Sequence, residues 1–588
     1  MQMAKCKLQI GLISGSWSVT LLLLFVFTLS AKAGTPRDDL LRLVPEDVGF
    51  CLVIQDLRGH SQAFLQSPFA KKLWESPIGM TIASAPEQKK LLEFEAQLQQ
   101  GLGVTWSQLR DEIFGDAVVF AYRPGSPGKE DQEQGLMLVH VHDPQLLADL
   151  AKRFNDVQKQ SGDLKELSAR EHHGVKYERR LERHGENFAY IHDHLLAFST
   201  REGMLQRVID LEQKSLPGEP AILHHLRRLD ADKALAALWI NPRAFDLSFE
   251  QKAKQLQGTE ATFMQRIQAH WKAVDGIAFS ATIKESEVKL ALALSAKTDL
   301  LPTAAKAVFS GEARPSDLWR AFPDNALLAM GGRLDTAAWN DFLSGLLPED
   351  KRQAIRDAAN RFAGPALGKN VAKDVLPGLG PDWGLCVLAP PDEQGSNRSW
   401  VPHAILALRI QRGDIAHAVL QTLNSLALLG VFAYNGSHPD QLTFHSLDKM
   451  EGSYLANDKE FPPGFQPTFA LKEGFLVLAS SPAAIRRFEL RPATARGGEA
   501  PAEPRDIPLF RMSLRDIAKY LSAHESALAE HIAKKNQGHP VSKEEIAHKL
   551  ADLTQICQLF NRIELVQRSD SGKLTLALRI QTAIPLGK

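Results

Sequence analysis

Histidines are the residues in this chain whose spacing could do chemistry. His140 and His142 stand two positions apart in an apolar run that predicts a strand, so both side chains should lie on one face of it. Further histidines follow in the next predicted strands and turns: His172, His173, His184, His192 and His194. Imidazoles gathered on a sheet could hold a zinc-like ion. His140 and His142 are therefore the candidate metal ligands.

A purely structural role for these histidines is the stronger expectation. In the internal repeat described below, the positions that answer His140 and His142 are Arg409 and Gln411. His192 and His194 flank Asp193 at what should be an exposed hairpin turn. The chain also has no H-E-x-x-H spacing, in which two histidines on one helix face bind zinc. We expect no cofactor.

No other catalytic constellation is visible, and we predict no catalytic residues. The G-x-S-x-G nucleophile elbow of serine hydrolases is missing downstream of the leader. No dinucleotide-binding fingerprint follows a predicted strand. Cys51, Cys386 and Cys557 lie in apolar runs, which favours small buried side chains over reactive thiols. The sequence leans away from an enzyme without excluding one.

The elements that must position these residues are written twice. The stretch from Leu43 to Leu57 reads as a turn with proline and acids, a short buried strand and a helix entry, and the stretch from Phe322 to Leu334 repeats it. Later segments recur in the same order, including Lys289–Leu294 and Lys573–Leu578. The predicted strands at 136–141 and 405–410 correspond in this repeat. Each is followed by a predicted helix, and we expect these helices to end at Asn155 and Asn424. We therefore predict an internal duplication.

Paired strands mixed with helices at irregular intervals predict an α+β fold with mostly antiparallel strands. We divide the chain into a signal peptide (1–33), a first half (34–298), a linker (299–316) and a second half (317–588). The two halves could pack about a pseudo-two-fold axis with a shared groove between them. The segment 491–508, rich in proline, glycine and charge, is expected to be a mobile loop.

The N-terminus has the order of a secretory signal. Lys5 and Lys7 precede an apolar run, and Ala31-Lys32-Ala33 offers a peptidase site before Gly34. The alternative is an uncleaved anchor through residues 8–31, which approach the ~20 residues needed to span a bilayer. We expect export to the periplasm or the extracellular space, and no other membrane-crossing segment.

Charge gives little indication of the partner. Cleavage after Ala33 removes Lys5, Lys7 and Lys32 but no acidic residue, so 69 basic against 69 acidic residues become 66 against 69. A chain so near neutrality has no broad electrostatic attraction to nucleic acid or to anionic lipid. The expected partner is a protein or another envelope ligand, with membrane contact only if the N-terminal segment stays uncleaved.

Three short elements resemble a family of exported bacterial proteins known as domain of unknown function 3352. They are Leu43-x-Pro45-Glu46-Asp47, Ser67-Pro68-Phe69 followed by Lys71-Lys72-Leu73, and Phe114-Gly115-Asp116 before a strand. The resemblance extends over most of the mature chain, although the second copy lacks the Ser-Pro-Phe element. It implies no catalytic or binding residues. The leading hypothesis is a non-enzymatic binding or assembly protein of the cell envelope, and the alternative is a secreted hydrolase or metal-dependent enzyme.

Overall fold

The computed structural model describes residues 35–587 except 215–218, 310–312, 336–348, 392–398, 439–440, 458, 460, 492–505 and 536–540. The predicted signal peptide and nearly all of the predicted mobile loop therefore lie outside the described residues. The fold is α+β, as predicted from the sequence.

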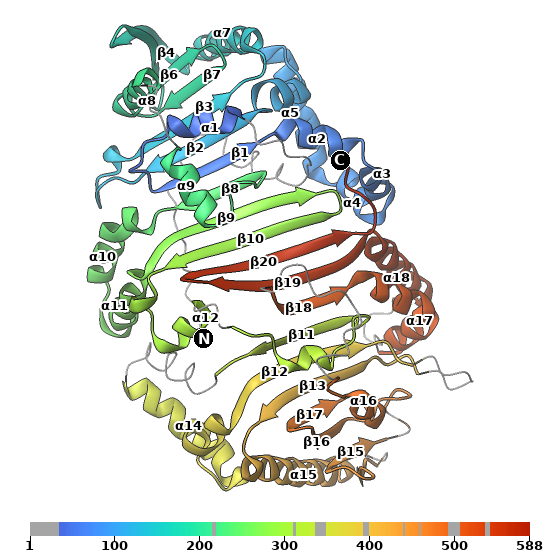
Figure 1. Cartoon of the computed structure of the whole chain (residues 1–588). Helices are drawn as coiled ribbons and strands as arrows, with labels where there is room; N and C mark the ends of the chain where they lie inside the picture. Colours follow the sequence, from blue (N-terminus) through green and yellow to red (C-terminus); the bar gives the residue numbers. More distant parts are fainter. Residues whose placement is uncertain are drawn as a thin grey trace.

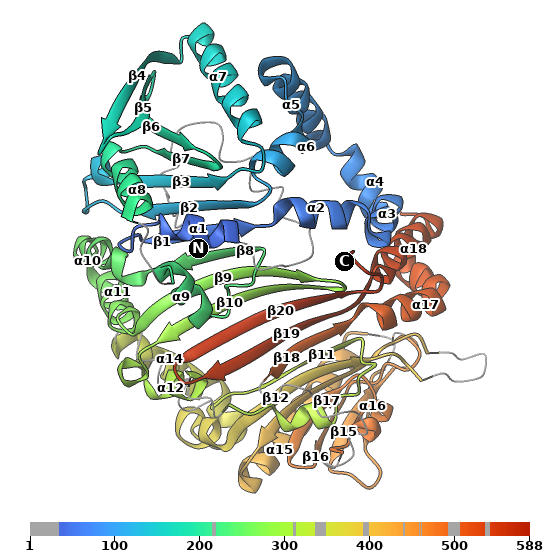
Figure 2. The ribbon, with the colours of Figure 1, turned by 45° about the horizontal axis from the view of Figure 1, so that its top comes forward.

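One curved sheet of twenty strands runs through the whole molecule (Figures 1 and 2). The strands of the first half are β1 (Phe50–Gln55), β2 (Ala117–Arg123), β3 (Gln134–His140), β4 (Leu164–His172), β5 (Val175–Glu182), β6 (Gly185–His192), β7 (Leu195–Ser199), β8 (Ala236–Ile240), β9 (Val274–Lys284) and β10 (Glu287–Ala296). Those of the second half are β11 (Leu328–Arg333), β12 (Leu379–Leu388), β13 (His403–Ile410), β14 (Thr443–Ser446), β15 (Gly452–Ala456), β16 (Thr468–Lys472), β17 (Phe475–Ala479), β18 (Ile507–Ser513), β19 (Phe560–Asp570) and β20 (Lys573–Thr582).

The strand order is the same in both halves. In the first half it is β4-β5-β6-β7-β3-β2-β1-β8-β9-β10, with every pair antiparallel. In the second half it is β14-β15-β16-β17-β13-β12-β11-β18-β19-β20, again antiparallel throughout. This shared order is what a duplication would produce. Descent of both halves from one ancestral unit stays a prediction.

The halves join edge to edge through β10 and β20, which pair antiparallel. In this register Leu292 lies opposite Leu576. These two leucines are also the positions that correspond in the predicted repeat, in which Lys289–Leu294 answers Lys573–Leu578. The same strand of each half therefore meets its counterpart, as two copies do across a two-fold axis.

Helices cover both faces of the sheet. The first-half helices, together with α12 of the predicted linker, are α1 (Thr35–Arg42), α2 (Leu57–Leu65), α3 (Pro68–Glu75), α4 (Pro77–Ser84), α5 (Pro86–Leu102), α6 (Trp106–Gln108), α7 (Pro144–Ser161), α8 (Glu202–Lys214), α9 (Ala221–Arg228), α10 (Asp246–Gln255), α11 (Gly258–Trp271) and α12 (Thr303–Phe309). The second-half helices are α14 (Glu349–Leu367), α15 (Gly413–Asn435), α16 (Pro482–Arg487), α17 (Leu514–Lys535) and α18 (Lys543–Gln558).

Each half has an apolar core on either side of its sheet. In the first half, buried residues of α1, α8 and α9 pack on one face, and α5 and α7 pack on the other. In the second half, α16 contributes to one core, while α14 and α15 contribute to the smaller core on the other face. α7 and α15 thus occupy equivalent places, since each follows the strand (β3 or β13) that pairs with the outer meander.

The Ser-Pro-Phe element of the first half forms a contact with the second half. Ser67 caps α3 by accepting a hydrogen bond from the Ala70 amide at 3.0 Å, and Pro68 stands at the first helical position, where its missing amide hydrogen costs nothing. This places the buried Phe69 against Phe560 of β19, with ring centroids 5.8 Å apart. The element serves a contact between halves.

The sequence analysis missed one strand and ended two helices too early. Strand β4 was not predicted, because its residues alternate with exposed charges at the edge of the sheet. α7 runs on from the predicted end at Asn155 to Ser161, where Gly162 takes the left-handed conformation that ends it. α15 continues past Asn424 to Asn435, because its apolar residues extend the helical pattern.

Candidate functional site

His140 and His142, the predicted metal ligands, are brought to one carboxylate. Asp116 lies immediately before β2, and β3 pairs with β2 so that His140 closes the strand beside it. The Nδ1 atoms of His140 and His142 lie 3.4 and 3.6 Å from Asp116 Oδ2. The other carboxylate oxygen, Oδ1, accepts a hydrogen bond from Arg58 Nη2 at 2.8 Å.

The charges of this group favour an ion-pair network. Burial alone would raise the pKa of Asp116, but the hydrogen bond with His140 and the positive charge of Arg58 outweigh it and lower that pKa. His140 also stacks on His194, with ring planes 8° apart. A guanidinium on the same carboxylate repels a second cation, so this arrangement suits a structural role. Metal binding by His140 and His142 stays a prediction.

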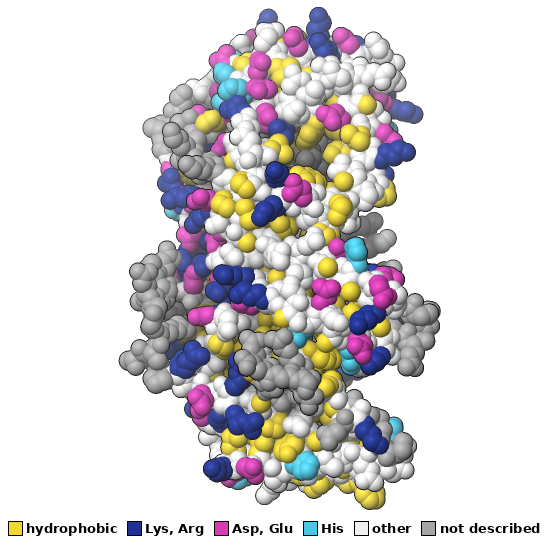
Figure 3. Space-filling view, turned by 90° about the vertical axis from the view of Figure 1, so that its right-hand side faces the viewer, with side chains coloured by type: hydrophobic (Ala, Val, Ile, Leu, Met, Phe, Trp, Pro, Cys, Tyr) yellow, Lys and Arg dark blue, Asp and Glu magenta, His cyan; other side chains and the backbone are white. Residues whose placement is uncertain are grey.

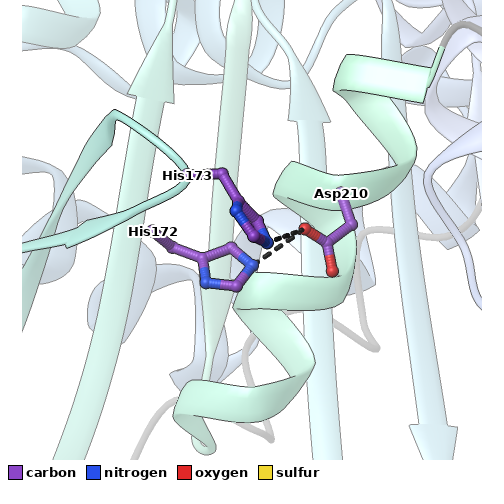
Figure 4. Close-up of side chains that lie close together, drawn as sticks. All are labelled: His172, His173 and Asp210. Carbon is purple, nitrogen blue, oxygen red and sulfur yellow. Dashed lines mark hydrogen bonds and ion pairs between the residues drawn. The ribbon is translucent and has the colours of Figure 1, made fainter.

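A different group brings three potential metal ligands together: His172, His173 and Asp210 (Figure 4). His172 ends β4 and pairs with Val175 of β5, so His173 and Gly174 form the two-residue turn. Their φ angles are 48° and 82°, as a type I′ hairpin turn requires. The turn therefore places two consecutive imidazoles at the tip of the hairpin.

Asp210 reaches this tip from helix α8. Its Oδ1 atom lies 2.8 Å from His172 Nε2 and 3.7 Å from His173 Nε2. The imidazole rings are 4.2 Å apart. The side chains of His172 and Asp210 are 21% and 33% exposed, whereas that of His173 is 65% exposed, so the group is open to solvent on one side.

Helix α8 is held firmly against the sheet that carries the hairpin. Met204, Leu205, Val208 and Ile209 are buried in the first-half core. On its flank, the Tyr190 hydroxyl donates to Glu212 at 2.7 Å, and His192 Nδ1 lies 3.0 Å from the same carboxylate. The hydrogen bond to Glu212 raises the pKa of His192. Asp210 therefore stands on a rigid element.

The sequence pointed to His172 and His173 as members of a histidine-rich region but not to Asp210. Asp210 is one acidic residue on a helix, and no fixed sequence spacing links it to the hairpin. Only the packing of α8 on β6 and β7 could have indicated it.

A cavity of about 870 Å³ lies elsewhere, among residues of the second half. Its lining comes from α17, the end of α18 and the ends of β19 and β20, and includes Arg515, Lys519 and Asn561. The lining residues all lie between 515 and 583, so this cavity is not a groove shared by the halves. It contains no histidine or acidic side chain.

Cys51, Cys386 and Cys557 are free and buried, as predicted. Burial raises the pKa of the Cys51 and Cys386 thiols to about 12, so neither is a thiolate near neutral pH. This removes both from consideration as nucleophiles.

These features define an α+β protein built on one antiparallel sheet, with several histidine-carboxylate groups in its first half. Residues 88–364 match the model of a family described as "Protein of unknown function (DUF3352)", the family that the sequence elements resemble. The matched range starts after the Leu-x-Pro-Glu-Asp and Ser-Pro-Phe elements and crosses the predicted boundary between the halves. It therefore covers less of the chain than expected and does not follow the repeat.

Comparison with curated proteins gave no match. Among solved structures, the chain shares 12% identity with "Structure of crystal form III of TP0453", at a TM-score of 0.22, covering 44% of this chain and 79% of that chain. For "Structure of crystal form I of TP0453" the identity is 12%, the TM-score 0.20, and the coverage 45% and 81%. These values are too low to assign a fold or a function.

Proposed function

We propose that this is an exported, non-enzymatic protein of the cell envelope that binds a lipid membrane through helix α15. The signal-like N-terminus supports export, because it would carry the chain to or across a membrane. The observation that carries the proposal is the exposed apolar surface of α15.

α15 is long and apolar enough to span a membrane by length and composition, contrary to the expectation that only the leader would be. Within the described residues it is the one helix that meets this test, and most of its apolar part is not buried. Asp414, in the first turn, is the one fully charged residue among its 23. A helix that is both apolar and exposed calls for a partner.

The fold buries only a narrow part of this helix. Ile415 and Leu420 are buried against the sheet. The N-terminal end is fixed by Asp414, whose carboxylate lies 2.9 Å from Lys369 Nζ and 2.8 Å from Arg412 Nη2. These two cations hold the pKa of Asp414 down at about 2. α15 is thus anchored at its start, and its second half faces outward.

The exposed part is the run Leu426–Ala433, which we call the α15 apolar surface. Leu429 is 65% exposed and Phe432 is 83% exposed, with Leu426 and Leu428 also exposed. α15 lies at the lower end of the molecule in Figure 1, and hydrophobic side chains reach that end in Figure 3. The surface is therefore placed where a flat partner can meet it.

Lipid fits this surface better than a protein partner does. The eight residues Leu426–Ala433 have no charged or hydrogen-bonding side chain. Protein interfaces carry roughly one hydrogen bond per 100–200 Å², whereas hydrocarbon needs none. The lack of cations on α15 also means that attraction to anionic headgroups is not required.

Vesicle flotation of the untagged mature protein tests this proposal. Wild type should float with phosphatidylcholine vesicles, with or without phosphatidylglycerol. Leu429→Glu combined with Phe432→Glu should lower the bound fraction at least tenfold, because each charge would have to enter the apolar layer. Val157→Glu, on the equivalent helix α7, is the matched control and should leave binding unchanged.

Two results would overturn the membrane proposal. Wild type that stays with the soluble fraction would do so, as would a double variant that floats like wild type. If light scattering shows a dimer that the double variant loses, the partner is a second copy of the chain instead.

Export is tested separately by sequencing the N-terminus of the protein recovered from its producing cells. A start at Gly34 supports cleavage. A start at Met1 or Gln2 supports an anchor through residues 8–31, and the apolar surface would then act on a chain already tied to the membrane.

A further inference from the structure

We propose that His172, His173 and Asp210 bind one divalent transition-metal ion of the zinc class. This proposal is independent of the membrane role, since it concerns the first half alone. Two imidazole nitrogens and one carboxylate oxygen suit zinc, copper, nickel or cobalt better than calcium or magnesium, which prefer all-oxygen ligands.

The three potential ligand atoms lie close enough together for one ion to contact all of them. Zinc bonds to nitrogen and oxygen are about 2.0–2.2 Å long, so two ligands at a tetrahedral angle lie roughly 3.3 Å apart. Asp210 Oδ1 lies 2.8 Å from His172 Nε2 and 3.7 Å from His173 Nε2, on either side of that value. The three potential ligand atoms all lie within 4.8 Å of one another. Small side-chain rotations are enough to admit an ion.

The backbone of the site is fixed before any ion arrives. The type I′ turn holds His173 and Gly174, and Gln213 Nε2 of α8 donates a hydrogen bond to the His173 carbonyl oxygen at 3.2 Å. The helix that supplies Asp210 is thus already bonded to the hairpin tip. Ligands on ordered elements lose less entropy on binding, which favours affinity.

The charge at Asp210 differs from that at Asp116. In the described part of the chain, the ion-pair partners of Asp210 are His172 and His173. Asp116 shares its carboxylate with Arg58 as well. Asp210 therefore offers an anionic ligand that no guanidinium neutralises, which is why the metal is assigned to this group.

Three protein ligands leave one position open to water or to a donor from a partner. β4 pairs with β5 and lies at the outer edge of the sheet. A bound ion would tie this edge hairpin to α8, which is packed into the core. The expected role is therefore to fasten the outer hairpin.

Zinc titration of the full mature chain without a histidine tag tests the proposal. Isothermal calorimetry should show one equivalent of zinc bound by wild type. His172→Gln, His173→Asn and Asp210→Asn should each raise the dissociation constant at least tenfold. Asparagine is chosen at 173 because it tolerates the positive φ there, and glutamine at 172 because it can still hydrogen-bond Asp210.

His184→Ala is the matched control, because His184 is an exposed histidine in the turn at the other end of β5 and should not affect zinc binding. Cobalt(II) gives a second readout, since its visible absorption bands report nitrogen and oxygen ligands directly. Those bands should disappear in the His173→Asn variant, whose exposed side chain is not needed for folding.

The proposal fails if wild type binds no zinc, or if the three variants bind it as wild type does. It also fails if the variants lose stability to the same extent with and without zinc while their zinc affinity is unchanged. That result would show that the His172–Asp210 hydrogen bond is only a structural link. Circular dichroism confirms that each variant tested is folded.

Discussion

Helices α7 and α15 hold equivalent places in the two halves, yet their surfaces have opposite character. α7 carries five charged residues: Asp149, Lys152, Arg153, Asp156 and Lys159. α15 carries one, Asp414, and exposes leucine and phenylalanine along its second half. Each helix nevertheless packs an apolar stripe against the strands beside it. The position in the fold therefore specifies the buried stripe and leaves the outer face free.

The same lesson applies to the ends of the sheet. The first half has the Ser67-capped helix α3 that reaches across to Phe560, and the second half lacks the Ser-Pro-Phe element. The first half also has the His172-His173 hairpin and Asp210 on α8. In the second half, α16, the helix after β17, has six residues and no acidic residue. Differences between the halves are concentrated in what each presents outward or to the other half.

The largest expected effect is on the contact between the halves. Phe69→Ala should lower the free energy of unfolding by about 3–5 kcal/mol, because it removes a fully buried ring and leaves a cavity beside Phe560. Urea unfolding followed by circular dichroism measures the loss. Trp74→Ala, on the same helix but 44% exposed, should have a much smaller effect. Equal midpoints for the two variants would mean that α3 does not hold the halves together.

The contrast between α7 and α15 can be sharpened with a fluorescent reporter. Tryptophan introduced as Phe432→Trp should be quenched by brominated lipid in vesicles, because its side chain would enter the apolar layer. Val157→Trp on α7 should not be quenched beyond the signal of the native tryptophans. Similar quenching at both positions would remove the distinction between the two helices.

The third prediction compares partly buried carboxylates, one from each half, by their pH dependence. Asp116 and Asp506 both have pKa values below the usual 3.8; burial opposes this, but His140 and Arg58, or Arg568 and Arg579, outweigh it. A lowered pKa in the folded state adds stability that is present above the unfolded value and lost as pH falls through the folded value.

Asp116→Asn and Asp506→Asn should therefore each reduce stability at about pH 7 and weaken its fall toward about pH 2.5. Denaturation midpoints across this range measure the effect. Asp193→Asn, whose side chain is 83% exposed at a hairpin turn, serves as the control. If the Asp116→Asn or the Asp506→Asn variant matched wild type at neutral pH, the ion pairs at that site would contribute no net stability.

The smallest expected effect is on the cap of α3. Ser67→Ala should cost about 1 kcal/mol, because the Ala70 amide would lose its hydrogen-bond partner in a buried place. Ser84→Ala, at the exposed end of α4, should change stability by less than about 0.5 kcal/mol. Unfolding measurements that rank these two variants in the reverse order would contradict the assigned role of the cap.

The sequence predicted the α+β class and most strands because apolar runs bounded by turn residues are local signals. The hairpin turn at Asp193, for example, was placed correctly between β6 and β7. β4 was missed because an edge strand needs few apolar residues. The pairing of β10 with β20 could not be predicted, because it joins segments from opposite ends of the chain whose patterns fit many partners.

The candidate sites were predictable only in part. Strand periodicity predicted His140 and His142 on one strand face, but β3 ends at His140 and His142 lies beyond it. The two histidines meet at Asp116, and Asp116 and Arg58 come from other elements. Asp210 joined His172 and His173 through tertiary packing alone. The length and apolar character of α15 were missed, since no membrane-crossing segment other than the leader was expected. Its exposure could not be predicted either, because whether a run such as that around Phe432, 83% exposed, is buried depends on tertiary packing.

The pairing of β10 with β20, in which Leu292 lies opposite Leu576, has a consequence for how the sequence of the two halves can evolve. In a homodimer whose subunits pair through the same strand, every substitution appears in both subunits, so the two copies cannot differ in sequence. Linked within a single polypeptide, the partners are free to specialise independently. The outer surface of one half can become apolar while the equivalent surface of the other half stays polar. The pairing of β10 with β20 is not affected by such a change.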